Sequence, residues 1–350
     1  MIMIDWVTAK VPFYYPGLLC DGEILNVTRD GEVQQSIRKR LAVTGSYDAS
    51  FTIRTSELDD NGDTCLVELS GNPVKFLQGH NLFGSSDLLN LVYETVLRLS
   101  DILATPQPEN VLEMIRGGLY TLSRIDINRM FTLGNRAEVL AYLYTLSANS
   151  RTRNQGPVTK GSTVYFNKTS KRWTIKVYCK AQEVALKRNK KQGTIDLPQD
   201  LKDWVEPMLR MELTLKSKEL IEHNLHKALN WATIEEHLIF SDYAERIQMS
   251  NQKPKDDLFL KIKSRPAAAS YQMWLDGHDL RQILPKNTFY RHRRALLEHD
   301  IDISIACSAA SKNSSNVVPF CKTLELQPAT LPHWVSGTDL YFEPRKLCSV

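Results

Sequence analysis

The sequence predicts an α+β protein, with a central antiparallel sheet, flanking helices and a mainly helical C-terminal module. Three observations predict this class. Segments that alternate apolar and polar residues, as half-buried strands do, recur over roughly the first 220 residues. Stretches with apolar residues at helical spacing separate them, and the pattern after residue 255 is mainly helical. The composition, 42% hydrophobic and 24% charged, supplies a sizeable core and excludes a disordered or collagen-like chain.

The expected elements follow in order along the first part of the chain. A helix is expected over Leu88–Leu103 because Ser85-Ser86-Asp87 is a suitable N-cap, and a second over Ala137–Leu146. Gly117-Gly118 breaks the chain between them, before a strand. The predicted strands are Trp6–Val11, Thr64–Ser70, Leu119–Asn128, Ser162–Phe166, Arg172–Cys179 and Met208–Lys216.

The polar stretch Ser250–Lys255 is a candidate hinge, so the sequence predicts two domains, residues 1–250 and 255–350. In the second domain Pro285 separates two predicted helices, Asp276–Leu284 and Lys286–His299. The last thirty residues show no clear periodicity.

Several classes of protein are not indicated. No apolar run approaches the ~18 residues of a membrane span and no leader is recognisable, so we expect a soluble protein that stays where it is made. The six cysteines are widely spaced with no C-x-x-C pair, which favours reduced thiols over a disulfide frame or zinc site. Walker, G-x-G-x-x-G, H-E-x-x-H and G-x-S-x-G motifs are all absent.

Positive charge is concentrated although the net charge is only +4. Between Arg151 and Lys191 the chain has twelve Lys or Arg and one acid, with aromatic residues interleaved, and Arg291–Arg294 forms a second basic focus. Such patterns suit a phosphate backbone and stacked bases, although a solvated basic face is the plainer alternative. The candidate DNA-binding residues are Arg151, Arg153, Lys168, Lys171, Arg172, Trp173, Lys176, Arg291, Arg293 and Arg294.

Two carboxylates lie within apolar strands, where a charge is costly unless it is paired or binds a metal. Asp126 is in Ser123–Ile127, and Glu212 is in Met208–Lys216. On spacing alone, Asp126 is more readily explained by a buried ion pair with Arg124 or another basic residue. Together the two acids also form an oxygen-rich pair suited to a hard divalent cation.

Two further residue types bear on chemistry. Tyr178 ends a basic strand and is a candidate nucleophile for phosphorus, whose phenol needs help from a metal or from Lys180. Its alternative is an ordinary core or stacking tyrosine. His80, between a strand and a helix cap, is more often structural than a ligand at such a position.

Several stretches resemble the gene II replication proteins of filamentous bacteriophages, over nearly the whole chain. The most specific is the run Lys75–Gly84, with Asp87. The others, in the same order as in that family, are Met3-Ile4-Asp5 with Val11-Pro12-Phe13, Ser123-Arg124-Ile125-Asp126, Ser162-Thr163-Val164 with Asn167, Tyr178-x-Lys180-x-x-Glu183, Arg210-x-Glu212-x-x-x-Lys216, Trp274-Leu275-x-Gly277-x-Asp279-Leu280 and Phe289-Tyr290-Arg291-x-Arg293.

The resemblance implies a rolling-circle nicking domain followed by a DNA-binding module, and a metal-dependent nickase and strand transferase. Such an enzyme nicks one strand at the viral origin through tyrosine, stays joined to the 5′ phosphate and later recloses the displaced strand as a circle. It implies Mg²⁺ or Mn²⁺ at Asp126, Glu212 and His80, Tyr178 as nucleophile and Lys180 as its electrostatic helper. Similar strand motifs occur in plasmid rolling-circle initiators.

One feature departs from many rolling-circle nickases, which carry a histidine–hydrophobe–histidine metal pair. His80 is the only histidine in the first 220 residues, so the metal set must be rich in acids or water. The nucleophile also has alternatives, since Tyr165 lies on a neighbouring basic strand and Tyr142 and Tyr144 lie on a helix.

The implied partners are the viral origin duplex and single-stranded DNA, with host helicase and polymerase, possible oligomerisation on DNA and no membrane, in the host bacterial cytoplasm. A replication-control protein that binds origin or single-stranded DNA without cutting it is the alternative function, and a plasmid or satellite-element initiator is a weaker one. The C-terminal helices suggest a helix–turn–helix-like reader of duplex DNA, against a helical oligomerisation tail with a basic face.

Overall fold

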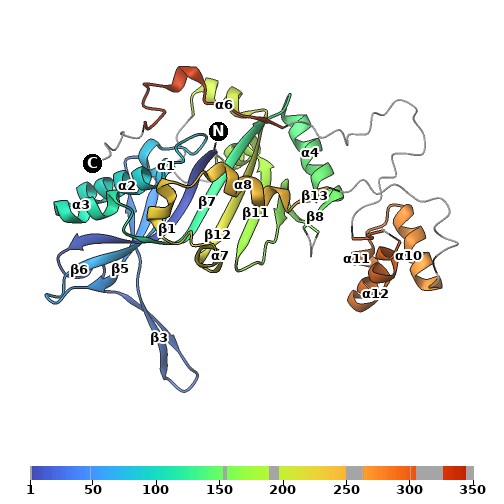
Figure 1. Cartoon of the computed structure of the whole chain (residues 1–350), viewed down its shortest axis with the longest axis horizontal. Coiled ribbons are helices and arrows are strands. Elements are labelled where there is room, and N and C mark those ends of the chain that lie inside the picture. The colour runs from blue at the N-terminus through green and yellow to red at the C-terminus, as the bar shows by residue number, and fades with distance from the viewer. Residues whose placement is uncertain are drawn as a thin grey trace.

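The computed structural model describes residues 2–47, 49–152, 156–188, 197–249, 262, 264–299, 301–304 and 326–343. The predicted α+β class is confirmed: a large antiparallel sheet is flanked by helices, and a separate helical cluster follows in the chain (Figure 1). The described part of the main sheet has the order β4-β5-β6-β1-β7-β12-β11-β10-β9, and β14 also pairs with β7.

The strands of the main sheet are β1 (Ile2–Tyr15), β4 (Leu41–Thr44), β5 (Ser50–Leu58), β6 (Thr64–Gly71), β7 (Thr121–Thr132), β9 (Val158–Lys160), β10 (Thr163–Phe166), β11 (Trp173–Cys179), β12 (Met208–Lys216) and β14 (Gln327–Pro328). Two small sheets pair β2 (Glu23–Val27) with β3 (Val33–Arg38) and β8 (Ser150–Arg151) with β13 (Gln248–Met249). The helices are α1 (Pro73–Gln78), α2 (Leu88–Ile102), α3 (Glu109–Arg116), α4 (Arg136–Asn149), α5 (Lys180–Arg188), α6 (Gln199–Val205), α7 (Ser217–Glu222), α8 (Glu236–Glu245), α10 (Arg265–Leu275), α11 (Leu280–Ile283), α12 (Lys286–Leu297) and the 3-10 helices Ala228–Ala232 and His333–Val335.

The two central strands, β7 and β12, separate an apolar face of the sheet from a polar one. Ile125 and Ile127 of β7 are fully buried, and the residues between and beside them in the strand, such as Asp126 and Asn128, point to the opposite face. The alternation predicted for Met208–Lys216 is confirmed, because every second residue from Leu209 to Leu215 joins the large core. The polar face is therefore where chemistry-bearing side chains collect.

Strand β1 contains an irregularity that matters for the site. Ile4 pairs with Ile127 and Trp6 pairs with Asp126, which are adjacent residues of β7. Asp5 is therefore an extra residue in β1 with no pairing partner in β7. Such a β-bulge bends the strand and re-aims a side chain. The carboxylate of Asp5 consequently lies with the polar groups of the neighbouring strands.

A tight connection positions the segment before α2. Helix α1 begins with Pro73 after the N-cap Asn72, and ends at Gly79, whose φ of 88° is in the left-handed region that glycine adopts easily. The loop that follows runs to Asp87, which caps α2 by accepting a hydrogen bond from the Asn90 amide at 3.0 Å. The predicted helix and its cap are confirmed.

A second hydrophobic cluster is formed by α10, α11 and α12, around Tyr271, Trp274 and Phe289. The expected break at Pro285 is confirmed, since this residue is the N-cap of α12. The expected helix Asp276–Leu284 was too long: Gly277 has a left-handed φ of 88°, and only Leu280–Ile283 is helical. Helix α10 precedes that turn.

Residues 326–343, which the predicted boundaries group with the C-terminal module, pack on the first core. Strand β14 pairs with β7 at Phe131 and Thr132, beyond Arg129, where the pairing of β1 ends. Ala329 and Val335 are buried in the large core. The division at residues 250–255 stays a prediction, and the candidate hinge Ser250–Lys255 lies outside the described residues.

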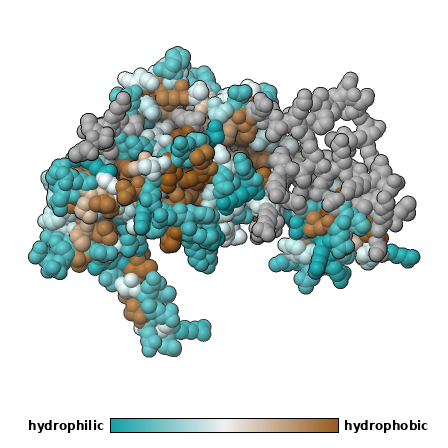
Figure 2. Space-filling model, viewed as in Figure 1, coloured by the Kyte–Doolittle hydropathy of each residue, from teal (hydrophilic) through white to brown (hydrophobic). Residues whose placement is uncertain are grey.

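The hairpin β2–β3 projects away from the sheet (Figure 1), and Figure 2 shows apolar side chains along it. Ile24, Leu25 and Val33 are exposed there. No described helix is both long and apolar enough to span a membrane.

Candidate active site

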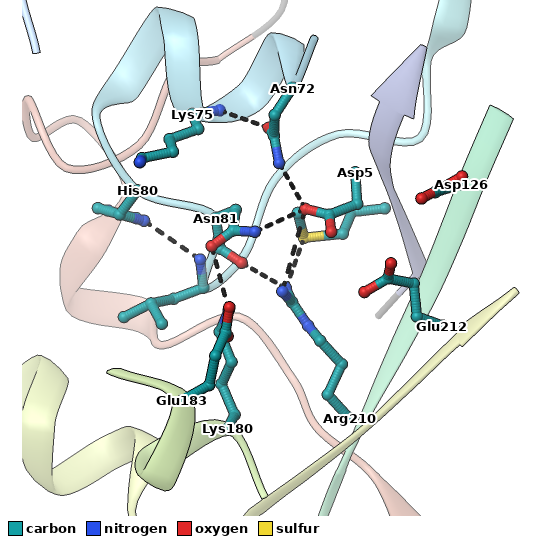
Figure 3. Close-up of polar contacts among 12 residues, drawn as sticks. Asp5, Asn72, Lys75, His80, Asn81, Asp126, Lys180, Glu183, Arg210 and Glu212 are labelled. Atoms are coloured by element: carbon teal, nitrogen blue, oxygen red, sulfur yellow. Dashed lines mark hydrogen bonds and ion pairs between the residues drawn. The ribbon is translucent and has the colours of Figure 1, made fainter. Parts of the chain in front are cut away.

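Three carboxylates gather on the polar face of the sheet. Asp5, Asp126 and Glu212 come from the adjacent strands β1, β7 and β12, and all three are buried. Figure 3 shows the carboxyl groups of Asp126 and Glu212 pointing toward Asp5. The bulge in β1 is the reason that Asp5 joins the two acids predicted from the sequence.

Cationic side chains balance these acids. Arg124 holds Asp126 with two hydrogen bonds, Nε to Oδ1 at 2.8 Å and Nη2 to Oδ2 at 2.6 Å. Lys176 lies 2.6 Å from Glu212 Oε1, directly across the β11–β12 ladder. The ion pair of Asp126 with Arg124, the plainer interpretation of the sequence, is therefore present.

Burial and the neighbouring charges shift the pKa values of the three acids in different directions. Burial, reinforced by the charge of Asp5, raises the pKa of Glu212 to about 7, and burial also raises the pKa of Asp126 despite Arg124. Burial acts in the same direction on Asp5, but the charges of Arg210 and Lys180 outweigh it and lower its pKa. Asp5 is thus the acid most firmly held as a carboxylate.

Tyr178 is next to the acids. Its hydroxyl donates to Glu212 Oε2 at 3.3 Å, and the Lys176 ammonium lies 5.4 Å from the ring centroid. The side chain is only 6% exposed, and this burial raises the pKa of its phenol well above the ordinary value. The phenol is therefore protonated at neutral pH, with a carboxylate in position to receive its proton.

Asn81 connects the loop after α1 to the acids and to two cations. Its Nδ2 donates to Asp5 Oδ1 at 2.7 Å, and its Oδ1 accepts from Lys180 Nζ at 3.1 Å. Its backbone carbonyl accepts a hydrogen bond from Arg210, which is fully buried. Lys180, 1% exposed, also contacts Glu183 at 2.5 Å. Asn81 therefore fixes both cations beside the carboxylates (Figure 3).

His80 does not lie with Asp126 and Glu212. Its Nδ1 faces Gln78 Nε2 at 3.3 Å and the Leu82 amide at 3.4 Å, and its ring packs edge-to-face on Phe83. Burial lowers its pKa to about 4. The structure thus brings Asp126 and Glu212 together with Asp5 beside them, and places the third predicted ligand, His80, among other partners.

The donor set suits a hard divalent cation. Asn128 lies directly across from Glu212 and is 1% exposed, yet neither its Nδ2 nor its Oδ1 has a hydrogen-bond partner among the described residues. Buried amides are rarely left so, which indicates a missing water or ligand. Among the described residues, no group of three or more His, Cys, Asp and Glu has the arrangement of a metal site. Asp126 and Glu212 are instead paired with Arg124 and Lys176.

The other candidate tyrosines are farther from this chemistry. Tyr165 is on β10, two strands from β12, with Lys168 Nζ 4.9 Å from its ring centroid. Tyr142 and Tyr144 are on α4, and Tyr144 is 77% exposed. Only Tyr178 among these four has a hydrogen bond to one of the three acids in the described part of the chain.

The predicted DNA-binding residues fall into two groups. Lys168 and Lys171 beside the main sheet, with Arg291 and Arg294 on α12, are exposed. The remaining described ones are held by other groups: Arg172 by Glu219 and Glu222, Lys176 by Glu212, Arg293 by Asp302 at 2.6 and 2.7 Å, and Trp173 against Tyr243 at 5.4 Å. Arg151 is in β8 and nothing is described of its side chain, and Arg153 lies outside the described residues.

Four residues of the site had no role assigned from the sequence: Asp5, Asn81, Asn128 and Arg210. Asp5 is flanked by apolar residues but lies just before the predicted strand Trp6–Val11, so it was not grouped with Asp126. Asn81 was inside the most specific run of the resemblance, and Arg210 was in its strand motif. For Asn128, at the end of a predicted strand, no sequence signal was available.

Comparison with known proteins gives consistent matches along the chain. The N-terminal family of the phage gene II replication-associated protein matches residues 3–234, and the C-terminal family of the same protein matches residues 257–341. The replication-associated protein of this kind from Enterobacteria phage I2-2 is 35% identical over 337 residues, covering 94% of this chain and 95% of the relative. Its counterpart from Enterobacteria phage M13 is 24% identical, covering 77% and 76%.

Among solved structures, a rolling circle replication initiator protein from Geobacillus stearothermophilus is similar at 13% sequence identity. The match covers 73% of this chain and 88% of that one, with a TM-score of 0.32. A score this low carries no conclusion about chemistry.

Proposed function

Because this chain belongs to the gene II family of phage replication-associated proteins, we propose that it is a phage rolling-circle replication initiator which nicks and rejoins DNA through Tyr178. The family resemblance predicted from the sequence motifs is thereby confirmed. The observation that carries the chemical part is the contact of a buried tyrosine hydroxyl with a carboxylate in a cluster of acids and cations.

The proposed reaction exchanges one phosphodiester for another. The Tyr178 oxygen attacks the phosphorus at the origin, forming a bond to the 5′ phosphate while the bond to the 3′ oxygen breaks. The leaving 3′ oxygen takes up a proton and becomes the primer terminus. In the second step a 3′ hydroxyl attacks the phosphotyrosine, which closes the displaced strand and restores the phenol. No bond energy is lost, so no nucleotide hydrolysis is needed.

Side chains of this chain have distinct tasks in that reaction. Glu212 Oε2, which accepts the hydrogen bond of the phenol, takes up its proton. Lys180 and Arg210, fixed by Asn81, offer positive charge to the phosphate oxygens. Lys176 holds the Glu212 carboxylate beside the ring of Tyr178.

We further propose that Asp5, Asp126 and Glu212, with the amide oxygen of Asn128, hold Mg²⁺ or Mn²⁺. The support is the oxygen-rich donor set and the two unpartnered amide atoms of Asn128. Held by these residues, a divalent cation would supply Lewis-acid polarisation of the scissile phosphate and charge stabilisation of the leaving oxygen. His80 is not part of this set, because its ring is held by Gln78 and Leu82.

The exposed cations supply the DNA contacts in this proposal. Lys168 and Lys171 would meet the strand entering the site, and Arg291 and Arg294 of α12 would bind origin duplex. Within the family's setting, the protein would act in the host bacterial cytoplasm with host helicase and polymerase.

The decisive experiment mixes purified full-length protein with a supercoiled plasmid that carries the cognate phage origin, with Mg²⁺ or with EDTA. Wild type is compared with Tyr178→Phe and with the matched control Tyr165→Phe. We expect a nicked circle with protein on its 5′ end from wild type and Tyr165→Phe, and no nicking from Tyr178→Phe or in EDTA.

Each other result has a definite meaning. If Tyr178→Phe still nicks DNA, another tyrosine is the nucleophile. If the wild type nicks DNA in EDTA, the reaction does not require the proposed metal. Tight origin binding without any nicking by wild type would replace the enzyme with a non-catalytic replication-control protein.

A further inference from the structure

The C-terminal strap, residues 326–343, reaches the loop that carries Asn81. Figure 1 shows its helical turn beside α6, at the edge of the molecule where the main sheet lies. The strap is anchored by β14 on β7 and by the Ala329 amide, which donates to the Met130 carbonyl at 2.9 Å. Strand β7 also carries Asp126 and Asn128, so strap and site share a rigid element.

The contact between strap and loop is made through Gln78. The backbone N–H of Phe342 donates to Gln78 Oε1 at 3.1 Å, and Gln78 Nε2 donates to the carbonyl of Phe83 at 2.8 Å and that of His80 at 3.3 Å. Gln78 is buried, and its two hydrogen bonds to the loop carbonyls are shielded from water, while its bond from Phe342 is partly buried. One amide group thus joins the strap to both ends of the segment that contains Asn81.

Aromatic packing supports the same contact. The ring of Tyr341 lies edge-on to Phe83 with centroids 6.0 Å apart, and Phe83 also packs against Trp204 and His80. The loop itself has no regular secondary structure after Gly79. Its conformation therefore depends on these contacts and on Gln78.

We infer that the C-terminal strap positions the catalytic loop, with Gln78 as the positioning residue through which it acts on Asn81 and its two cations, Lys180 and Arg210. Asn81 contacts Lys180 through Oδ1 and Arg210 through its carbonyl, so a shift of the loop moves both charges away from the reacting phosphate. Misplacement by about 1 Å is enough to lower a rate by about 100-fold. The inference rests on the proposed function for its kinetic part only.

The test uses full-length Phe342→Pro, which removes the backbone donor, and Phe342→Ala, which keeps the donor and removes the ring. We expect Phe342→Pro to lower the single-turnover nicking rate on a preformed origin complex by about 10- to 100-fold, with origin Kd within twofold of wild type. Phe342→Ala should keep most of the rate. Equal rates for Phe342→Pro and wild type would overturn the inference.

A second pair of variants tests the inference independently, in case Phe342→Pro does not fold. Gln78→Glu keeps the acceptor for Phe342 but loses the donors to His80 and Phe83, and should also lower the rate at unchanged origin Kd. The comparison variant is Gln107→Glu, because the Gln107 side chain also bridges backbone groups, the N–H and carbonyl of Tyr14, although it does so at the surface and away from the loop. Equal losses in both glutamine variants would indicate a general structural effect and contradict the inference.

A DNA-free readout separates this inference from the nicking proposal. Hydrogen exchange of the amides of residues 79–83 should be faster in Phe342→Pro than in Phe342→Ala, without any substrate. If wild type nicks no DNA but this difference is present, the function fails and the positioning contact stands. If exchange is the same in both variants, the strap does not hold the loop.

Discussion

Replacing His80 with asparagine is expected to remove a specific acid sensitivity of the fold. Burial lowers the pKa of His80 from 6.5 to about 4. Below pH 6.5 the unfolded chain therefore takes up a proton that the folded protein does not take up until the pH approaches 4. Stability contributed by the neutral imidazole is complete above pH 6.5 and is lost progressively as the pH falls to 4.

The magnitude follows from the two pKa values. At pH 5 the linkage relation gives a loss of about 2 kcal/mol from this residue, approaching about 3.4 kcal/mol below pH 4. Asparagine is the suitable replacement, because its Oδ1 can accept from the Leu82 amide where Nδ1 does now. The other titrating groups, Glu212 among them, are common to both proteins and cancel in the difference.

Urea unfolding of wild type and His80→Asn at pH 7.5 and pH 5 measures the effect. Between these two pH values, wild type should lose about 2 kcal/mol more than the variant. Titration of the His80 ring proton by NMR gives the folded pKa independently. Equal pH dependence of the two proteins, or a measured pKa near 6.5, would refute the reasoning.

Three further predictions follow from the ion pairs and the unpartnered amide. Arg293→Ala removes the ion pair of the buried Asp302 carboxylate and should destabilise the helical cluster by about 3–5 kcal/mol in denaturant unfolding, whereas Arg291→Ala should leave stability within about 0.5 kcal/mol. Lys168→Ala should reduce the slope of log affinity against log salt by about 0.7 for single-stranded DNA in fluorescence titrations, if Lys168 neutralises one phosphate; an unchanged slope contradicts that contact. Asn128→Leu should stabilise the metal-free protein by about 1–3 kcal/mol, because it removes unpaired buried amide atoms, while weakening Mn²⁺ binding in calorimetry; unchanged Mn²⁺ affinity excludes Asn128 as a ligand.

The sequence predicted those elements in which local signals agree with tertiary packing. The strand Met208–Lys216 shows strict alternation and the helix after Asp87 has a clear cap, and both form as expected. The hairpin β2–β3 was not predicted, since its apolar residues, such as Ile24 and Val33, are exposed and follow no buried pattern. Strand β14 is two residues long and depends entirely on its pairing with β7.

The site shows the same division between local and long-range information. The environment of Asp126 and Glu212 could be predicted, because an acid in an apolar strand is a local signal. The inclusion of Asp5 depends on a bulge, which is visible only in the pairing of β1 with β7. The separation of His80 from the acids depends on the side chain of Gln78, and sequence spacing contains no information on where an amide two residues away points.

The contact between the strap and Gln78 can form only late in synthesis, after the C-terminal residues have been added. Phe83 and Phe342 are 259 residues apart in the chain (342 − 83), which at about 5–20 residues per second means that roughly 13–50 s pass between their addition on the ribosome. Until then the acids, Tyr178 and Lys180 are already made, but the backbone N–H that donates to Gln78 does not exist. A chain that ends before residue 326 lacks the hydrogen bond from Phe342 to Gln78. On the proposed function, such a truncated chain would nick DNA more slowly than the full-length protein.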